Sequence, residues 1–463
     1  MSIYRNHLPI MGASGAQSTG YEIEQSIRFN DDDSPFMDRT PSSASNQTTW
    51  TISCWVKIGN IPGNYTIWCV HTAYQSYAQI RSSTGLEFAV GNGSSGSSYH
   101  ALTSFFRDPS AWYHLVMIFD STNNTSSERA RIYVNGQRET DFSNTGSWTK
   151  NYSSNVNSTQ KMYIGEQGVG GNHMEGYIAE FHHVDGYAYG PEYFGEFNSS
   201  NIWIPKEYSE SYGTNGFYLK GQNSSALGDD SSGNNNDFTV QAGLAASDQV
   251  LDSPTNNFCV ANPLDNYFFA GTFSDGNLKL TSSSASGNYT FHTTTMKLPE
   301  TGKWYAEVEC DVVGSGVGFG ISENVSTAIN KYIGNLSTAF AYYSNGQSFH
   351  EGGSSFGDSY TSGDIIGIAV DMDNKKIYYS KNGVFQGSGN PAGNSNGLSI
   401  DSGVTYFFAA NDDTGAGTTS TWIWNFGQGG TNTGGMTDSN GIGNFKYSVP
   451  SGFLALCSKN LGS

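Results

Sequence analysis

The chain has 463 residues, of which only 14% are charged, while 57 are Gly, 28 are Tyr and 27 are Phe. This composition, rich also in Ser, Thr and Asn, lacks helical periodicity and predicts an all-β protein. A formal charge of −19 and a pI near 4.7 exclude nucleic acid as a partner, because phosphate binding needs clustered Lys and Arg.

The N-terminal stretch, residues 1–20, contains Pro9 and scattered Gly, and we expect an irregular arm there. It has no apolar core typical of a secretory signal, and no apolar run in the chain approaches membrane-spanning length. The five cysteines are odd in number and lack C-x-x-C spacing. We therefore expect no signal peptide, no membrane insertion, and cysteines that are buried small apolar residues in a reducing cytoplasm.

Residues 21–190 show strand patterns at regular spacing. Thr49–Lys57 alternates between apolar and polar side chains, which predicts one strand face made of Trp50, Ile52, Cys54 and Val56. Further along, two β-branched and aromatic runs flank a polar loop in residues 112–136 and end at Asn135-Gly136. Asn-Gly favours a type I′ turn, since both central positions need positive φ. We expect a meander whose core-facing residues are Trp112, Val116, Ile118, Ile132 and Val134.

This first region resembles the laminin-G-like, concanavalin-A-like sandwich. The resemblance rests on the order of four motifs: Ile52 with Trp55-Val56, Trp112-Tyr113-His114, Tyr133–Gly136, and Gly176–Phe181 before Asp185-Gly186.

Residues 191–265 have a different character, with Pro191, Pro205 and a polar tract, and we interpret them as an irregular linker with one or two strands. The stretches Asp252–Phe258 and Asn262–Asp265 resemble the connector found in structural proteins of tailed bacteriophages.

Residues 266–427 repeat the pattern of the first meander: an apolar strand ends at Asp371, and the next strand ends at Asn382-Gly383. With Gly302–Val308, Gly316–Ile321, Gly363–Gly367, Tyr406–Ala410 and Trp424–Gly427, this region resembles a SPRY domain, itself a concanavalin-A-like sandwich. The sequence thus predicts two antiparallel jelly-roll sandwiches joined by a linker. Residues 428–463 form a Gly-rich segment and a C-terminal tail that we interpret as a last strand or a docking peptide.

Catalytic and metal sites find little support in the sequence. Glu307, Glu309 and Asp311 have the alternate spacing that some glycoside hydrolases use, but in an order that departs from those enzymes. We expect a solvated strand face and no enzyme activity. His182-His183 cannot easily share an ion, because adjacent strand residues point to opposite faces. We expect no cofactor, with Ca²⁺ left open through loop carboxylates such as Asp31–Asp33, Asp229-Asp230, Asp371 with Asp373, and Asp412-Asp413.

Glycan binding is the positive hypothesis, because sugars bind to aromatic platforms flanked by side chains that both donate and accept hydrogen bonds. The candidate glycan- or partner-binding residues are Tyr74, Tyr77, Trp148, Tyr342, Tyr343, Asn345, Phe349 and Asp412.

Together these resemblances imply a virion structural protein of a phage, a capsid decoration or tail-fibre component that attaches to host-surface glycans. Its expected partners are other virion proteins, host glycans and further copies of itself, without nucleic acid or membrane insertion. It would be made in the host cytoplasm and located in the virion. Two alternatives stay open: a polysaccharide-degrading tail enzyme, and a cellular adhesion or scaffold protein that binds peptides through SPRY-like loops.

Overall fold

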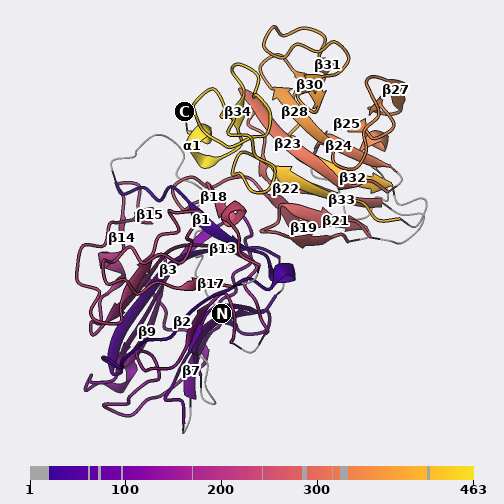
Figure 1. The fold of residues 1–463 in the computed structure, drawn as a ribbon. Helices are drawn as coiled ribbons and strands as arrows, with labels where there is room; N and C mark the ends of the chain where they lie inside the picture. The colour runs from indigo at the N-terminus through magenta and orange to yellow at the C-terminus, as the bar shows by residue number, and fades with distance from the viewer. Residues whose placement is uncertain are drawn as a thin grey trace. The chain divides into compact units, whose positions relative to one another are not determined.

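A computed structural model describes residues 20–60, 63–70, 75–94, 97–168, 170–241, 243–268, 270–283, 289–314, 316–323, 332–413 and 418–462. The chain divides after Asn257 into two compact units, each built from antiparallel β-sheets (Figure 1). The predicted all-β class, with two jelly-roll sandwiches, is confirmed. No helix among the described residues is both long and apolar enough to cross a membrane.

The first unit is a sandwich of two sheets. Its sheet A has the order β10-β9-β8-β3-β13-β1-β18, with β16 pairing to β13. These strands are β10 (Gln137–Arg138), β9 (Ala130–Val134), β8 (Trp112–Asp120), β3 (Thr49–Ile58), β13 (Gly176–Asp185), β1 (Ser26–Phe29), β18 (Gln249–Val250) and β16 (Phe217–Leu219). Sheet B runs β11 (Phe142–Asn144), β7 (Ser97–Leu102), β6 (Gly85–Gly91), β5 (Ser76–Arg81), β4 (Tyr65–Val70), β12 (Met162–Ile164), β2 (Met37–Arg39) and β17 (Thr239–Val240).

Most of the hydrophobic core of this unit lies between the two sheets. It contains the predicted face of β3, so the alternation that placed Trp50, Ile52, Cys54 and Val56 together is confirmed. The five cysteines of the chain are all buried, as expected.

A third layer covers the outer face of sheet A. We call it the covering layer and define it as residues 186–212, which include the hairpin of β14 (Gly195–Phe197) and β15 (Trp203–Pro205). Trp203 packs with Trp55 and Trp112. A neighbouring cluster joins Phe194 to side chains of β8 and β13. Sheet A is therefore buried on both faces, which explains why nearly every residue of β3, β8 and β13 is buried.

The covering layer corrects the predicted orientation of β8. Ile132 and Val134 do face the core between the sheets. Trp112, Val116 and Ile118 instead face outward, under the covering layer. The core positions of β8 are the intervening residues, Tyr113, Leu115, Met117 and Phe119.

Residues 191–265 contain more regular structure than the one or two strands expected. They contribute β14, β15, β16, β17 and β18 to the first unit, and β19 (Ala261–Phe268) begins the second. β16, β17 and β18 pair with β13, β2 and β1.

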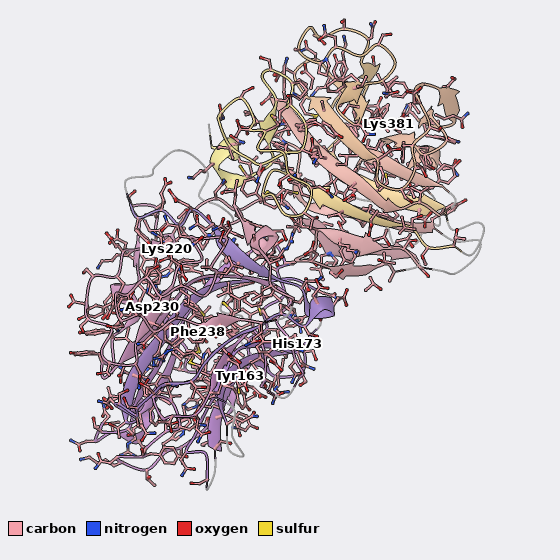
Figure 2. The ribbon with its side chains drawn as sticks, in the orientation of Figure 1. Tyr163, His173, Lys220, Asp230, Phe238 and Lys381 are labelled. Atoms are coloured by element: carbon pink, nitrogen blue, oxygen red, sulfur yellow. The ribbon has the colours of Figure 1, made fainter. Side chains whose placement is uncertain are left out.

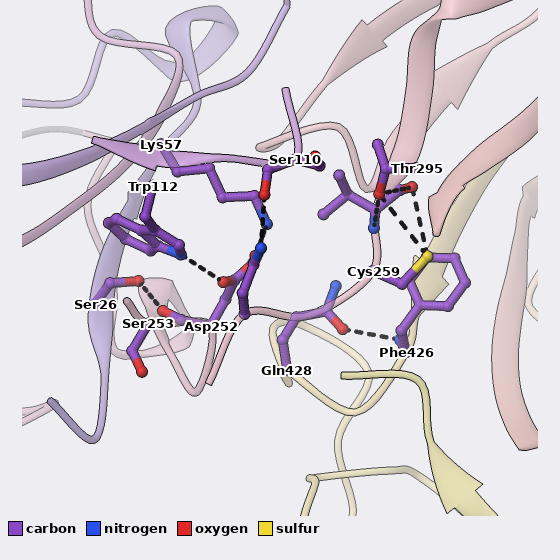
Figure 3. A network of polar contacts seen from close by, with 12 residues as sticks. Ser26, Lys57, Ser110, Trp112, Asp252, Ser253, Cys259, Thr295, Phe426 and Gln428 are labelled. Atoms are coloured by element: carbon purple, nitrogen blue, oxygen red, sulfur yellow. Dashed lines mark hydrogen bonds and ion pairs between the residues drawn. The ribbon is translucent and has the colours of Figure 1, made fainter. Parts of the chain in front are cut away.

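The connector-like residues before Asn257 are anchored inside the first unit (Figure 3). Lys57 and Asp252, neither with any exposed side-chain surface, form an ion pair of 2.7 Å. Lys57 also donates to Asn257 at 2.8 Å, and the Trp112 indole donates to Asp252 at 3.0 Å. The Ser26 hydroxyl donates to the Asp252 carbonyl at 2.6 Å. This polar cluster fixes the end of the unit to β1, β3 and β8.

The second unit is also a two-sheet sandwich with a core between the sheets. One sheet runs β19, β22 (Tyr289–Lys297), β32 (Phe407–Asp413), β24 (Val317–Ser322), β25 (Ala339–Tyr343), β26 (Gln347–Phe349) and β27 (Gly353–Ser355). The other runs β20 (Thr272–Ser274), β21 (Lys279–Thr281), β33 (Thr421–Asn425), β23 (Lys303–Val312), β28 (Ile365–Asp371), β29 (Lys376–Lys381) and β30 (Val384–Phe385), with β31 (Leu398–Ser399) beside β29.

The C-terminal tail folds back onto the second unit. Its strand β34 (Leu454–Ala455) pairs in parallel with β23, and the short helix α1 (Ser458–Leu461) follows. Both carboxylate oxygens of Glu307 accept backbone N–H groups of the tail, from Lys446 at 2.7 Å and Tyr447 at 2.9 Å. The tail is thus an integral part of this unit.

Candidate functional site

The residues predicted to bind glycans in the first unit lie in different environments. Tyr74 lies outside the described residues. Trp148 is buried in the core, where its indole donates to the Val90 carbonyl at 2.9 Å. Tyr77 is half-buried on β5; burial and the nearby Glu87 raise the pKa of its phenol to about 12.

In the second unit the predicted residues divide between interior and surface. Tyr342, Tyr343 and Asp412 are buried, so their side chains are packed inside the unit and are not surface platforms. Asn345 is exposed, and Phe349 is half-buried with its ring 4.4 Å from that of Tyr343. The structure therefore does not gather the predicted residues into one surface site.

The expected solvated strand face is wrong for Glu307, which is buried, while Glu309 and Asp311 are half-buried. Glu307 is buried and accepts the two tail amides together with the Tyr305 hydroxyl at 3.1 Å. Burial raises its pKa above the usual range, and the backbone hydrogen bonds oppose that shift. Asp311 pairs with Lys279 at 3.3 Å. In the part of the chain that the structure describes, no group of three or more His, Cys, Asp or Glu side chains could hold a metal ion.

A pocket of about 400 Å³ lies instead on the outer side of the first unit, at the edge of the covering layer. Its volume falls within the range of roughly 300–1,000 Å³ that small-molecule sites occupy. We call it the tyrosine pocket. Its lining residues come from five parts of the chain: Tyr21, His182, Glu207, Tyr208, Ser209, Glu210, Ser211, Tyr212, Tyr218, Lys220, Ser231, Ser232 and Asn234.

The floor of the pocket is shaped by a β-bulge in β13. Ala179 pairs with Trp55 and His182 with Ser53, so three steps along β13 match two along β3. The extra residue is Glu180, whose φ of 50° lies in the left-handed region. A non-glycine residue there is strained, and such strain concentrates at functional sites. The Glu180 carboxylate and the His182 imidazole, two residues apart in β13, lie 3.4 Å from each other.

Glu180 is buried and held by tyrosine hydroxyls. Tyr218 donates to one of its oxygens at 2.5 Å, and Tyr21 donates to the other at 3.0 Å. The His182 Nε2 lies 3.4 Å from the carboxylate, and its Nδ1 lies 2.8 Å from the Tyr212 hydroxyl. A carboxylate, an imidazole and three phenols thus form one connected polar network.

Aromatic stacking rigidifies this network. The His182 ring stacks on Tyr218 at 4.3 Å, because β16 places Tyr218 directly opposite His182. Tyr212 lies nearly parallel to both rings, and Tyr208 lies 4.7 Å from Tyr212. Offset and edge-on aromatic pairs of this kind contribute roughly 0.5–1.5 kcal/mol each beyond their buried area.

Two loops forming the walls are fixed by the backbone of β13 and β16. The amide of Asp185, at the end of β13, donates to the Tyr212 carbonyl at 2.8 Å. Asp230 accepts the Tyr218 amide at 2.9 Å, and the Asn234 side chain donates to the Gly213 carbonyl at 2.7 Å (Lys220 and Asp230 are labelled in Figure 2). The pocket is therefore held in shape by the sheet beneath it.

The pocket was not predicted from the sequence, although His182 and the linker segment of residues 191–265 both contribute to it. The prediction that His182 and His183 point to opposite faces is confirmed: His183 bonds to Asn157 inside the sandwich, while His182 lies in the pocket. One signal was available, the density of Tyr in a segment interpreted as a linker: Tyr187, Tyr189, Tyr193, Tyr208, Tyr212 and Tyr218. A bulge at Glu180 has no comparable sequence signature.

The comparisons with known proteins identify both sandwiches. Residues 36–187 match the family model of the Concanavalin A-like lectin/glucanases superfamily, and residues 303–389 match that of the SPRY domain. A similar relative is the Dual specificity protein kinase splA of Dictyostelium discoideum, 33% identical over 76 residues, which are 16% of this chain and 3% of that protein. The chain therefore spans only a small fraction of the relative that it matches.

Among solved structures, the SPRY domain of human HERC1 is 15% identical, with a TM-score of 0.29, covering 35% of this chain and 96% of that domain. The heptameric SAP-like pentraxin of Limulus polyphemus is 14% identical, with a TM-score of 0.27, covering 37% of this chain and 80% of the pentraxin. By its family matches, the chain carries a concanavalin A-like domain and a SPRY domain.

Proposed function

We propose that this protein is a structural component of a phage-like virion, a capsid decoration or tail-fibre protein, that attaches to host-surface glycans through the tyrosine pocket. The pocket is the observation that supports glycan binding. It combines phenol rings with exposed Ser, Asn and Glu side chains that accept and donate hydrogen bonds. A sugar can stack on such rings, and its hydroxyl groups can bond to such side chains. The match to the lectin and glucanase superfamily on the same unit supports the same assignment.

Glycan binding is tested by measuring full-length protein against a polysaccharide and glycan panel. We expect Tyr208→Ala and Tyr212→Ala to weaken binding at least tenfold, because both rings line the pocket. Tyr99→Ala is the matched control, since Tyr99 is exposed on β7 of the opposite sheet. Absence of binding to every saccharide on the panel would contradict the proposal.

The virion assignment rests on the resemblance of residues 252–258 and 262–265 to the connector of tailed-bacteriophage structural proteins. Antibody labelling of intact particles tests it. We expect the label on capsid or tail, and a protein that copurifies with no particle would refute this part of the proposal while leaving glycan binding to its own test.

A further inference from the structure

The charge of the tyrosine pocket selects among glycans. Among the described residues that line it, the carboxylates of Glu207 and Glu210 are exposed at the rim, and Lys220 supplies the one ammonium group. Below them lies the carboxylate of Glu180. The described part of the pocket lining thus contains two carboxylates and one lysine, and the Glu180 carboxylate lies behind it, bound to the hydroxyls of Tyr21 and Tyr218.

The buried carboxylate is held without a permanent cation. Its hydrogen-bond donors are the neutral hydroxyls of Tyr21 and Tyr218, and its other neighbour is the His182 imidazole. In contrast, the buried carboxylate of Asp252, in the same unit, has Lys57 at 2.7 Å. A buried carboxylate held by neutral groups leaves its negative potential in the pocket, since hydroxyl donors orient dipoles toward the charge but do not cancel it.

Burial is the main cause of the raised pKa values of the pocket phenols, and nearby carboxylates add to it. The pKa of Tyr21 is raised above its usual value first by burial and then by the charge of Glu180, with a smaller contribution from Glu207. The pKa of Tyr212 is raised by burial and, among charged groups, by Glu180 and Asp230. Carboxylates from both the floor and the neighbouring loops therefore act on the same space.

Aromatic rings complete a site suited to a cation. A positively charged amine is attracted to the faces of tyrosine rings within about 6 Å, and the interaction strengthens when water is excluded. The pocket offers Tyr21, Tyr208, Tyr212 and Tyr218 around its carboxylates. A neutral or anionic sugar would gain the stacking contacts but not the charge attraction.

Resting on the glycan-binding function proposed above, we infer that the tyrosine pocket recognises a saccharide carrying a free, positively charged amine. The amine would lie against the phenols above Glu180, with Glu207 and Glu210 at the rim. An acidic or fully N-acetylated saccharide is the class it disfavours.

The test is calorimetric titration of the full-length protein with a glucosamine hexamer, whose amines are free, and with the fully N-acetylated hexamer. We expect the free-amine hexamer to bind at least tenfold more tightly, with affinity that falls at high salt because the rim charges are screened. A Glu207→Gln/Glu210→Gln double variant should weaken binding of the amine form about fivefold, the effect of exposed ion pairs worth about 1 kcal/mol. Both positions are exposed, so the fold is preserved; Glu196→Gln, exposed on β14, is the matched control.

The binding results distinguish the preference for an amine from glycan binding itself. Equal binding of the two hexamers, unaffected by the rim variants but removed by Tyr212→Ala, would overturn the amine inference and leave glycan binding standing. Binding of other saccharides without either hexamer would do the same. Failure of every saccharide to bind would remove both.

Discussion

Lys57 has no exposed side-chain surface, and its position at the end of β3 makes it the residue on which the end of the first unit is anchored. A buried ammonium is tolerated only when it is paired and hydrogen-bonded. Asp252 and Asn257 provide those partners from residues 195 and 200 positions later in the chain.

We predict that Lys57→Met destabilises the first unit by about 3–5 kcal/mol, because it leaves the Asp252 carboxylate buried without its cation. Urea unfolding of the full chain, read from exchange-protected peptides of β3 and β8, measures the change. Lys161→Ala is the control: Lys161 also pairs with a carboxylate, Asp38, at 2.7 Å, but its side chain is 43% exposed, so we expect at most about 1 kcal/mol. Equal effects of the two variants would contradict the argument.

The buried imidazole of His114 makes the stability of the first unit depend on pH. Its Nδ1 accepts from the Trp203 indole of the covering layer at 3.0 Å, and its Nε2 lies 2.8 Å from the Ser53 hydroxyl. Burial lowers its pKa to about 3. The folded state therefore holds the imidazole neutral, while the unfolded chain takes up a proton near pH 6.5. Stability from this residue is present above pH 6.5 and is lost as the pH falls toward 3.

We expect His114→Gln to flatten the loss of stability between pH 6.5 and 4 by about 1.4 kcal/mol per pH unit, the contribution of one proton taken up on unfolding. The measurement is the urea midpoint of the β3 and β8 peptides at several pH values. His173→Gln, whose ring is partly exposed, serves as the control. An unchanged slope in His114→Gln would show that the imidazole does not titrate on unfolding.

At the scale of elements, the two Asn-Gly hairpins are built alike. Asn135 and Gly136 have φ of 48° and 75°, and Asn382 and Gly383 have φ of 50° and 80°, which confirms both predicted turns. Each asparagine bonds in the same way to one residue of the neighbouring strand, His114 of β8 in the first unit and Ile365 of β28 in the second. The asparagine amide donates to the carbonyl of that residue, and the asparagine side-chain oxygen accepts from its amide.

Each turn glycine also lies beneath a ring from a later segment. A Cβ at Gly136 would lie 2.4 Å from the Trp203 ring, and one at Gly383 would lie 2.7 Å from the Tyr447 ring. We predict that Gly136→Ala and Gly383→Ala each destabilise their unit by about 1–3 kcal/mol, through positive φ and displacement of the ring. Gly403→Ala isolates the first effect, since φ there is 77° and a Cβ would meet nothing within 4 Å. Thermal denaturation should show a smaller loss for it than for Gly383→Ala.

Strands and turns were predictable from sequence because period-2 alternation and Asn-Gly are local signals. The orientation of β8 was not, because the covering layer buries both of its faces and removes the polar alternation that marks a solvent side. The tyrosine pocket was not predictable for a different reason. Its lining includes Tyr21, His182 and Tyr218, which are far apart in sequence. The pairing of β16 with β13 and the bulge in β13, which bring such residues together, have no local sequence signal.

At the scale of the molecule, each unit contains a segment from the later part of its sequence that packs against its own sheets. In the first unit it is the covering layer, and in the second it is the tail held by Glu307. The family match to residues 36–187 ends at the start of the covering layer. The matched region is thus shorter than the compact unit that the chain forms.

We therefore predict that a fragment of residues 20–257 is soluble and cooperatively folded, whereas one of residues 20–190 aggregates. The shorter fragment exposes the outer face of sheet A, including Trp55, Trp112 and Val116, and leaves Lys57 without Asp252. Size-exclusion chromatography and binding of a hydrophobic dye distinguish the two. A monomeric, dye-negative shorter fragment would show that the covering layer is dispensable.

The bulge at Glu180 allows the pocket to change during evolution through a single residue. β13 holds one residue more than its pairing with β3 requires. Deletion of the Glu180 codon would restore regular pairing of β13 with β3 and would remove the buried carboxylate at the same time. The pocket chemistry can thus be switched by one insertion or deletion event, without a change in the sandwich that supports it, and related chains of unequal length at this position are expected to differ in ligand rather than in fold.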